Sequence, residues 1–232
     1  MSEQNVTALP ESQATSSMVM IRALGLAATI CGLIIVSTYE GTLKPVAANK
    51  QIALERAVFK VVPGATSMRE FVATTAGIQP AGETTPENAL KFYAAYDRAG
   101  ALKGVAAEGA ANGYAGEVRV LYAYDPAKQA ITGIGVVSMH ETPGIGDKIL
   151  TDPDFLRNFN ALDVRLNADM KAVANAVKVV KHGTKQNPWE IDAISGATIT
   201  SKAVGKGIRE STEKLLPLLL PNADKLKKGD AK

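Results

Sequence analysis

The stretch D-A-I-S-G-A-T-I-T-S occupies residues 192–201 and runs into a segment of helical pattern, S-K-A-V-G-K-G-I-R-E-S-T-E-K-L-L. It sets the small residues Ser195, Gly196 and Ala197 directly before the hydroxyl of Thr198. A Ser/Thr cluster at such a boundary indicates a helix cap, because a hydroxyl accepts hydrogen bonds from the free amides of the first turn. The same amides and the helix dipole also suit a phosphate, and small side chains let a bulky phosphorylated ligand approach the backbone. Local chemistry therefore leaves two interpretations open, a capped helix and a phosphate-binding helix start.

A second stretch, S-M-H-E-T-P-G-I-G-D-K, occupies residues 138–148. Its Pro-Gly pair favours a tight turn in which Gly144 takes a positive φ, and Gly146 keeps a second position free of a side chain. Such a loop exposes backbone amides and lets a flat ring come close, with Glu141 as an acceptor and Thr142 as a hydroxyl beside it. The alternative interpretation is a polar exit from a hairpin.

Both stretches resemble motifs of the FMN-binding domain family. The run D-A-I-S-G-A-T is similar to the flavinylation motif D-x-x-S/T-G-A-T, and the T-S-K-A-V after it most resembles the G subunit of Rnf-type electron transport complexes. The run E-T-P-G-I-G resembles the second motif of the family, and G-Y-A-G-E-V at residues 113–118 resembles its G-Y-x-G-x-V opening. In this family the last Thr of the flavinylation motif carries FMN through a phosphoester bond. The resemblance therefore implies FMN attached covalently to Thr198.

The resemblance also implies the surroundings of the cofactor and the partners of the chain. No catalytic residue and no metal ligand are expected, and Asp192 either orients the Thr198 hydroxyl during attachment or caps the turn. The implied partners are other subunits of a membrane electron transport complex, a separate flavin transferase that uses FAD and magnesium, and membrane lipid. Besides Thr198, the implied cofactor-binding residues are Asp192, Ser195, Gly196, Ala197, Glu141, Thr142, Gly144 and Gly146.

An apolar run at residues 18–39 is long enough to cross a bilayer as one helix. A cleaved signal peptide is the alternative. However, the segment of 17 residues before the run is longer than the usual start of a signal peptide, and it contains Glu3 and Glu11. No A-x-A cleavage site follows the run. We therefore predict an uncleaved transmembrane helix.

These features divide the chain into four parts. Residues 1–17 are predicted to be a flexible cytoplasmic tail, 18–39 the transmembrane helix and 40–63 a linker helix. Residues 64–232 are predicted to be a periplasmic FMN-binding domain, with its motifs at 113–204. The positive charges after the span do not favour a cytoplasmic N-terminus, but long domains translocate largely regardless of charge. The periplasmic side, and with it the bacterial inner membrane, is implied by the resemblance.

The expected fold class is α+β, with an antiparallel hairpin in the sheet. Alternating apolar residues predict strands near 116–124 and 130–139. Helices are predicted from Pro86 to Asp97, where the proline suits a helix start, and from Pro153 to Asn160. Residues 74–85 read as loop, and the segment V-A-N-A-V-K-V-V-K as either strand or helix. After Thr198 an apolar stripe indicates a helix packed on the core, at Val204, Ile208, Thr212 and Leu215.

Composition excludes several other classes of protein. A net charge of +3 and an aromatic content of 5% argue against a nucleic-acid-binding surface. The single cysteine, Cys31, lies in the apolar run, so no thiolate cluster ligands are available elsewhere. The chain has no G-x-x-x-x-G-K-S/T and no G-x-G-x-x-G, which argues against attachment of the flavin by the chain itself.

The resemblance implies an electron-relaying subunit of an ion-translocating ferredoxin:NAD oxidoreductase, a redox translocase, without substrate turnover of its own. Two alternatives stay open at this point. One is the C subunit of a sodium-translocating NADH:quinone reductase, which shares the flavin motif. The other is a cofactor-free periplasmic scaffold module on a membrane anchor.

Overall fold

The computed structural model describes residues 17–82, 86 and 89–226. The chain divides into two compact units, Met1–Gln51 and Ile52–Lys232. Helix α1, Ser17–Val61, belongs to both units and contains Pro45, whose nitrogen donates no hydrogen bond to the helix. Among the described helices it is the one that is long and apolar enough to cross a membrane. The predicted span 18–39 lies within this helix, whereas the predicted tail lies almost wholly outside the described residues.

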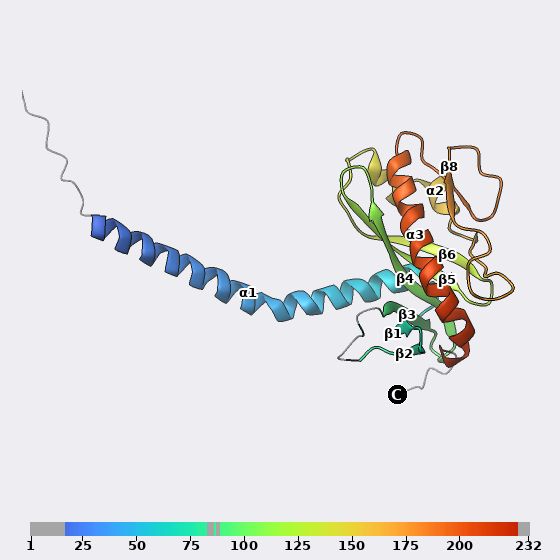
Figure 1. Cartoon of the computed structure of the whole chain (residues 1–232), viewed down its shortest axis with the longest axis horizontal. Helices are drawn as coiled ribbons and strands as arrows, with labels where there is room; N and C mark the ends of the chain where they lie inside the picture. Colours follow the sequence, from blue (N-terminus) through green and yellow to red (C-terminus); the bar gives the residue numbers. More distant parts are fainter. Residues whose placement is uncertain (1–16, 83–85, 87–88, 227–232) are drawn as a thin grey trace, which may run out of the picture. The chain divides into compact units, whose positions relative to one another are not determined.

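The second unit is built on a seven-stranded antiparallel sheet in the order β2-β1-β3-β4-β5-β6-β7 (Figure 1). Its strands are β1 Ser67–Thr74, β2 Gly77–Pro80, β3 Leu90–Tyr96, β4 Leu102–Asn112, β5 Glu117–Asp125, β6 Ala130–Met139 and β7 Leu162–Asp163. A separate parallel pair consists of β8 Lys178–Val180 and β9 Glu190–Asp192. The helical elements that follow β6 in the sequence are η1 Gly146–Leu150, α2 Pro153–Arg157, α3 Thr198–Leu219 and η2 Leu220–Leu226. The α+β class and the β5–β6 hairpin predicted from the sequence are confirmed.

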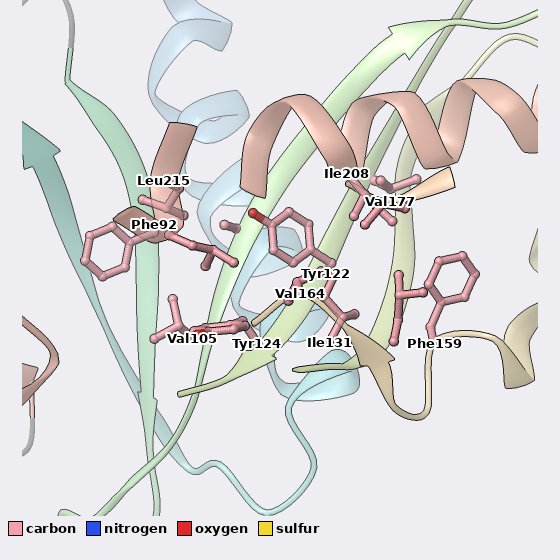
Figure 2. Close-up of a cluster of buried hydrophobic side chains, with 14 of the residues drawn as sticks. Phe92, Val105, Tyr122, Tyr124, Ile131, Phe159, Val164, Val177, Ile208 and Leu215 are labelled. Carbon is pink, nitrogen blue, oxygen red and sulfur yellow. The ribbon is translucent and has the colours of Figure 1, made fainter. Parts of the chain in front are cut away.

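Helix α3 packs closely on the middle of the sheet because glycines meet at the crossing. A side chain on Gly109 of β4 would lie 2.6 Å from the backbone of Gly207 in α3. One turn further on, Ser211 Oγ donates to the carbonyl oxygen of Glu108 at 2.7 Å and lies 2.9 Å from the hydroxyl of Tyr122. Figure 2 shows the resulting core, in which Ile208 of α3 belongs to the same buried cluster as Tyr122. The predicted stripe of α3 is confirmed, since all four of its residues are buried.

The opposite face of the sheet is covered by the last turns of α1. Val58 and Val61 are buried against Tyr93 and Leu121 in a second cluster. A side chain on Gly133 of β6 would lie 2.7 Å from the carbonyl oxygen of Val61, so a glycine is needed for this close contact. Both faces of the sheet therefore pack against apolar residues. The loops at one end of the sheet lie outside this packing and can form a site.

The helix predicted from Pro86 to Asp97 is wrong, because Leu90–Tyr96 is strand β3. This strand lies between β1 and β4 and is buried on both faces, so its apolar residues do not alternate and the pattern hides the strand. Residues 74–85, predicted as loop, contain the short strand β2. The second predicted helix is confirmed as α2, and the ambiguous segment before the motif contains β8.

Candidate functional site

A cavity of about 470 Å³ lies at the start of α3, within the usual size range of sites for small molecules. Three segments far apart in the sequence build it: the turn between β4 and β5, the loop after β6, and the first turn of α3 with the residues before it. The lining residues are Tyr114, Glu141, Thr142, Ile145, Gly146, Gly196, Ala197, Thr198, Ile199 and Thr200. The structure thus brings together the two motifs that the sequence singled out.

The first turn of α3 is open toward this cavity. Ala197 is the N-cap residue, and none of the described side chains accepts a hydrogen bond from the helix start. The Ser201 hydroxyl instead donates to the Ala197 carbonyl oxygen at 2.9 Å and accepts from the Ile194 amide at 3.1 Å. Of the two interpretations of the Ser/Thr cluster, the helix capped by a hydroxyl is therefore not what forms. The free amides and the positive end of the helix dipole remain available to an anion.

Two threonines of the first turn have opposite environments. Thr198 is exposed, and its hydroxyl has no hydrogen-bond partner among the residues that the structure describes. Thr200 is 2% exposed, and its hydroxyl donates to Glu141 Oε2 at 3.1 Å. Of these two hydroxyls, that of Thr198 is the one free to react.

Glu141 ties the three segments of the cavity to one another. Its Oε1 atom accepts from the backbone amide of Tyr114 at 2.8 Å, and its Oε2 atom accepts from Thr200. A side chain on Gly146 would lie 2.7 Å from Glu141 Cβ, and one on Gly113 would collide with the carboxylate. Two glycines therefore make room for this glutamate, so that its carboxylate reaches both the turn and the helix.

The loop after β6 forms the predicted tight turn. Gly144 has a φ of +77°, and the amides of Ile145 and Gly146 donate to the carbonyl oxygen of Thr142 at 3.2 and 3.0 Å. Gly144 itself is not part of the cavity lining. Gly146 is buried, and the space beside it is filled by Glu141, so its lack of a side chain serves the packing of the loop.

Asp192, at the other end of the flavinylation-like motif, does not line this cavity, and neither does Ser195. The Asp192 side chain borders a separate cavity of about 340 Å³ together with Asn158, Lys185, His182, Asp154 and Arg157. Its Oδ2 atom accepts from the Gly183 amide at 2.9 Å. This hydrogen bond holds the loop between β8 and β9 against the Asp192 side chain.

Asn158 is the centre of this second network. Its Oδ1 atom accepts from Lys185 Nζ and from the Asp192 amide, each at 3.0 Å. Its Nδ2 atom donates to the carbonyl oxygen of Phe155 at 2.9 Å and lies 3.3 Å from that of Asp192. Burial lowers the pKa of Lys185 from its ordinary value.

Sequence reasoning missed four lining residues, Tyr114, Ile145, Ile199 and Thr200. Three of them are large apolar side chains that stay exposed, at 71%, 49% and 53% for Tyr114, Ile145 and Ile199. Between residues 62 and 226, the described part of the chain exposes only two others, Val137 and Leu150. Exposed apolar surface thus gathers at this cavity, which indicates a ligand with an apolar face. The G-Y-A-G turn was the available signal for Tyr114.

The charges around the cavity limit the ligand further. Glu141 is the one charged residue among the described residues of the lining, so no lysine or arginine is there to bind a phosphate. The described residues also contain no cluster of three or more metal-ligating side chains. Among the lining elements, the start of α3 is therefore the one that offers positive partial charge to an anion.

The comparisons with known proteins agree with this geometry. Residues 113–213 match the FMN-binding domain family. The chain is 32% identical over 166 residues to the G subunit of the Na(+)-translocating ferredoxin:NAD(+) oxidoreductase complex of Acetobacterium woodii, covering 72% of this chain and 71% of the relative. It is 31% identical over 186 residues to the G subunit of the proton-translocating ferredoxin:NAD(+) oxidoreductase complex of Clostridium ljungdahlii, covering 80% and 84% of the two chains.

Solved structures share the fold at lower sequence identity. NqrC of Shewanella oneidensis superposes with a TM-score of 0.57 at 21% identity, covering 78% of this chain and 99% of that one. The C subunit of the Na(+)-translocating NADH-quinone reductase of Parabacteroides distasonis gives a TM-score of 0.55 at 21% identity, covering 81% and 98% of the two chains. The identity to the G subunits, over most of both chains, decides between these groups. The chain belongs to the family of G subunits of ion-translocating oxidoreductase complexes, with an FMN-binding domain in its C-terminal half.

Proposed function

We propose that this chain is the electron-carrying G subunit of an ion-translocating ferredoxin:NAD oxidoreductase complex, with FMN joined to Thr198 by a phosphoester bond. The observation that supports this most directly is the uncapped start of α3, where the exposed Thr198 hydroxyl has no partner among the described residues and opens into the cavity. The neighbouring Thr200 is buried and already donates to Glu141. When bound, FMN supplies reversible electron transfer, and the chain supplies its place and surroundings.

The charge of the site fits a phosphoester better than free FMN. A phosphate joined to both a riboflavin chain and a threonine carries one negative charge, whereas the phosphate of free FMN carries close to two near neutral pH. The start of a helix carries about half a positive elementary charge, and no basic side chain of the described residues lines the cavity to add to it. A covalent bond therefore retains the cofactor where the charges alone hold it weakly.

The remaining lining fits the flavin ring. Ile145 and Ile199 are exposed apolar residues of the lining, and Glu141 and Thr142 add polar atoms to it. A few placed polar groups among apolar side chains are typical of cofactor sites. This composition gives no reason to prefer a cofactor-free scaffold module.

The apolar helix α1 and the relatives together indicate a single-pass membrane protein that works with other subunits. We propose that it lies in the bacterial inner membrane, with residues 64–232 on the periplasmic side. A separate flavin transferase that uses FAD and magnesium would attach the FMN, since neither nucleotide-binding motif is present in the sequence.

Flavin fluorescence on a denaturing gel tests the covalent bond. The full chain is produced with and without a flavin transferase, denatured, separated and illuminated. The proposal expects a fluorescent band at the mass of this chain only when the transferase is present. A chain that stays dark with an active transferase, while a known substrate of that enzyme fluoresces, would overturn the covalent cofactor.

A further inference from the structure

We propose that Tyr114 packs its ring against the isoalloxazine ring of the bound flavin. This inference rests on the proposed function, because it needs a flavin in the cavity at the start of α3. It assigns a cofactor contact to the tyrosine of the G-Y-A-G turn, which lies more than twenty residues before the loop after β6.

The exposure of Tyr114 is the first observation. The side chain is 71% exposed and is the most exposed aromatic residue described after the apolar helix. The aromatic pairs in the described residues join Phe71 to Phe92 and Phe155 to Phe159, so Tyr114 has no ring partner there. Aromatic rings gain much from burial and from stacking, so a solvent-facing tyrosine at the wall of a cavity suits a planar ligand.

The second observation is that the turn beneath this exposed ring is fixed. The Tyr114 amide donates to Glu141 at 2.8 Å, and the Gly113 amide donates to the carbonyl oxygen of Gly116 at 2.7 Å. A side chain on Gly116 would lie 3.0 Å from His140 Cβ, so the turn sits directly against the segment before Glu141. The backbone is therefore held while the ring remains uncovered, which is the arrangement of a preformed ligand contact.

Glu141 also relates this turn to the attachment residue. The same carboxylate that holds the Tyr114 amide accepts from Thr200, two residues after Thr198. One side chain thus links the turn that carries Tyr114 to the helix turn that carries Thr198. Because Tyr114 and Thr198 line the same cavity, a flavin joined to Thr198 would lie in a space that Tyr114 bounds.

The optical properties of the flavin provide the test. A phenol in contact with a photoexcited flavin donates one electron to it and takes the electron back, which quenches fluorescence without net change. A ring held in a fixed chiral setting also gives visible circular dichroism. Both signals are measured on the purified full chain with FMN attached, in the wild type and in Tyr114→Phe, Tyr114→Ala and the control Leu150→Ala. Leu150 is another exposed apolar side chain, at 46%, but it does not line the cavity.

We expect Tyr114→Phe to keep the circular dichroism, because stacking remains, and to raise the fluorescence yield, because the phenol is gone. Tyr114→Ala should also raise the fluorescence yield of the flavin. It should lower the ratio of flavin rings packed on the protein to free flavin rings about fivefold, because one aromatic contact usually contributes that much. Leu150→Ala should match the wild type in both signals. Unchanged fluorescence in Tyr114→Phe, with FMN confirmed on the chain by intact mass, overturns the contact. A wild-type chain without FMN instead overturns the proposed function.

Discussion

The two ends of the motif D-A-I-S-G-A-T lie in contrasting surroundings. At one end Thr198 lines a cavity that includes exposed apolar residues, and its hydroxyl has no hydrogen-bond partner among the described residues. At the other end Asp192 borders a polar cavity and joins a network of Asn158, Lys185 and Gly183. Five residues thus separate an end with an exposed, unbonded hydroxyl from an end that is hydrogen-bonded into the fold. The difference teaches that matching a motif does not place all of its residues in one site.

The largest expected effect comes from separating the two threonines of the first turn. Thr198→Ala should abolish covalent flavin and leave the free energy of unfolding nearly unchanged, since the exposed hydroxyl has no partner among the described residues. Thr200→Ala should keep the flavin and lower the free energy of unfolding by about 1–2 kcal/mol, because Glu141 loses a buried donor. Intact mass and urea unfolding of both variants measure the two effects. Flavin retained in Thr198→Ala would move the attachment to another residue.

Breaking the other end of the motif should affect stability only. Asn158 is buried, and its side chain satisfies Lys185 and the Asp192 amide. Asn158→Ala should lower the free energy of unfolding by about 2–3 kcal/mol, because a buried carbonyl oxygen and two part-buried donors lose their partner. The control Asn222→Ala removes one bond to the Leu218 carbonyl oxygen and should cost about 1 kcal/mol. Both variants should carry FMN when folded, and a folded Asn158→Ala chain without it would link the two ends.

The negative charge of Glu141 should affect the midpoint potential of the flavin. Glu141→Gln keeps one acceptor for Tyr114 or Thr200 and should lower the free energy of unfolding by about 1 kcal/mol. It removes the negative charge from the cavity wall, and a reduced flavin anion is then less repelled. The midpoint potential should therefore rise in a redox titration of the purified chain. An unchanged potential would show that the carboxylate acts only through its hydrogen bonds, and a lower potential would contradict the predicted charge effect.

Two glycines with similar positive φ angles allow the same substitution to be compared at the two ends of the motif. Gly196 lines the flavin cavity with a φ of +82°, and Gly183 lies in the Asp192 network with a φ of +76°. A Cβ at either position would meet no atom within 4 Å. Replacing each with alanine should cost about 1 kcal/mol from the positive φ alone. Only Gly196→Ala should also alter the visible circular dichroism of the flavin, and equal spectra in both variants would contradict the assignment of the cavity.

The smallest effect is the acid sensitivity of the loop beside Asp192. Backbone hydrogen bonds from Gln186 and Asn187 lower the pKa of Glu190 below its ordinary value of 4.5. A carboxyl with a lowered folded pKa stabilises the fold above the unfolded pKa, and this contribution is lost as the pH falls through the folded value. Glu190→Gln should flatten the fall in stability below pH 4.5, as measured by urea unfolding across that range. If the free energy of unfolding falls equally steeply with decreasing pH in Glu190→Gln and in the wild type, Glu190 is not the cause of this acid sensitivity.

Sequence patterns predicted the elements whose periodicity is visible. The hairpin β5–β6 and the buried stripe of α3 follow the periods expected of a strand pair and of a helix packed on one face. Strand β3 is buried on both faces, so its pattern resembles that of a helix. In the site, the motifs indicated Thr198 and Glu141 as neighbours of one cofactor. Glu141 acts through hydrogen bonds to residues that are 27 or more positions away in the sequence, and Gly146 makes room for the Glu141 side chain. A pattern of neighbouring residues does not record such contacts.

Peptide mapping of the wild-type chain, matured with a flavin transferase, tests the central claim most directly. Trypsin releases residues 186–202, a peptide that holds Ser195, Thr198, Thr200 and Ser201 together. Fragmentation of this peptide locates any added mass on one of the four hydroxyls. The account predicts FMN, less one water, on Thr198. The same mass on Thr200, whose hydroxyl is buried against Glu141, or an unmodified peptide from a fully matured chain, would contradict it.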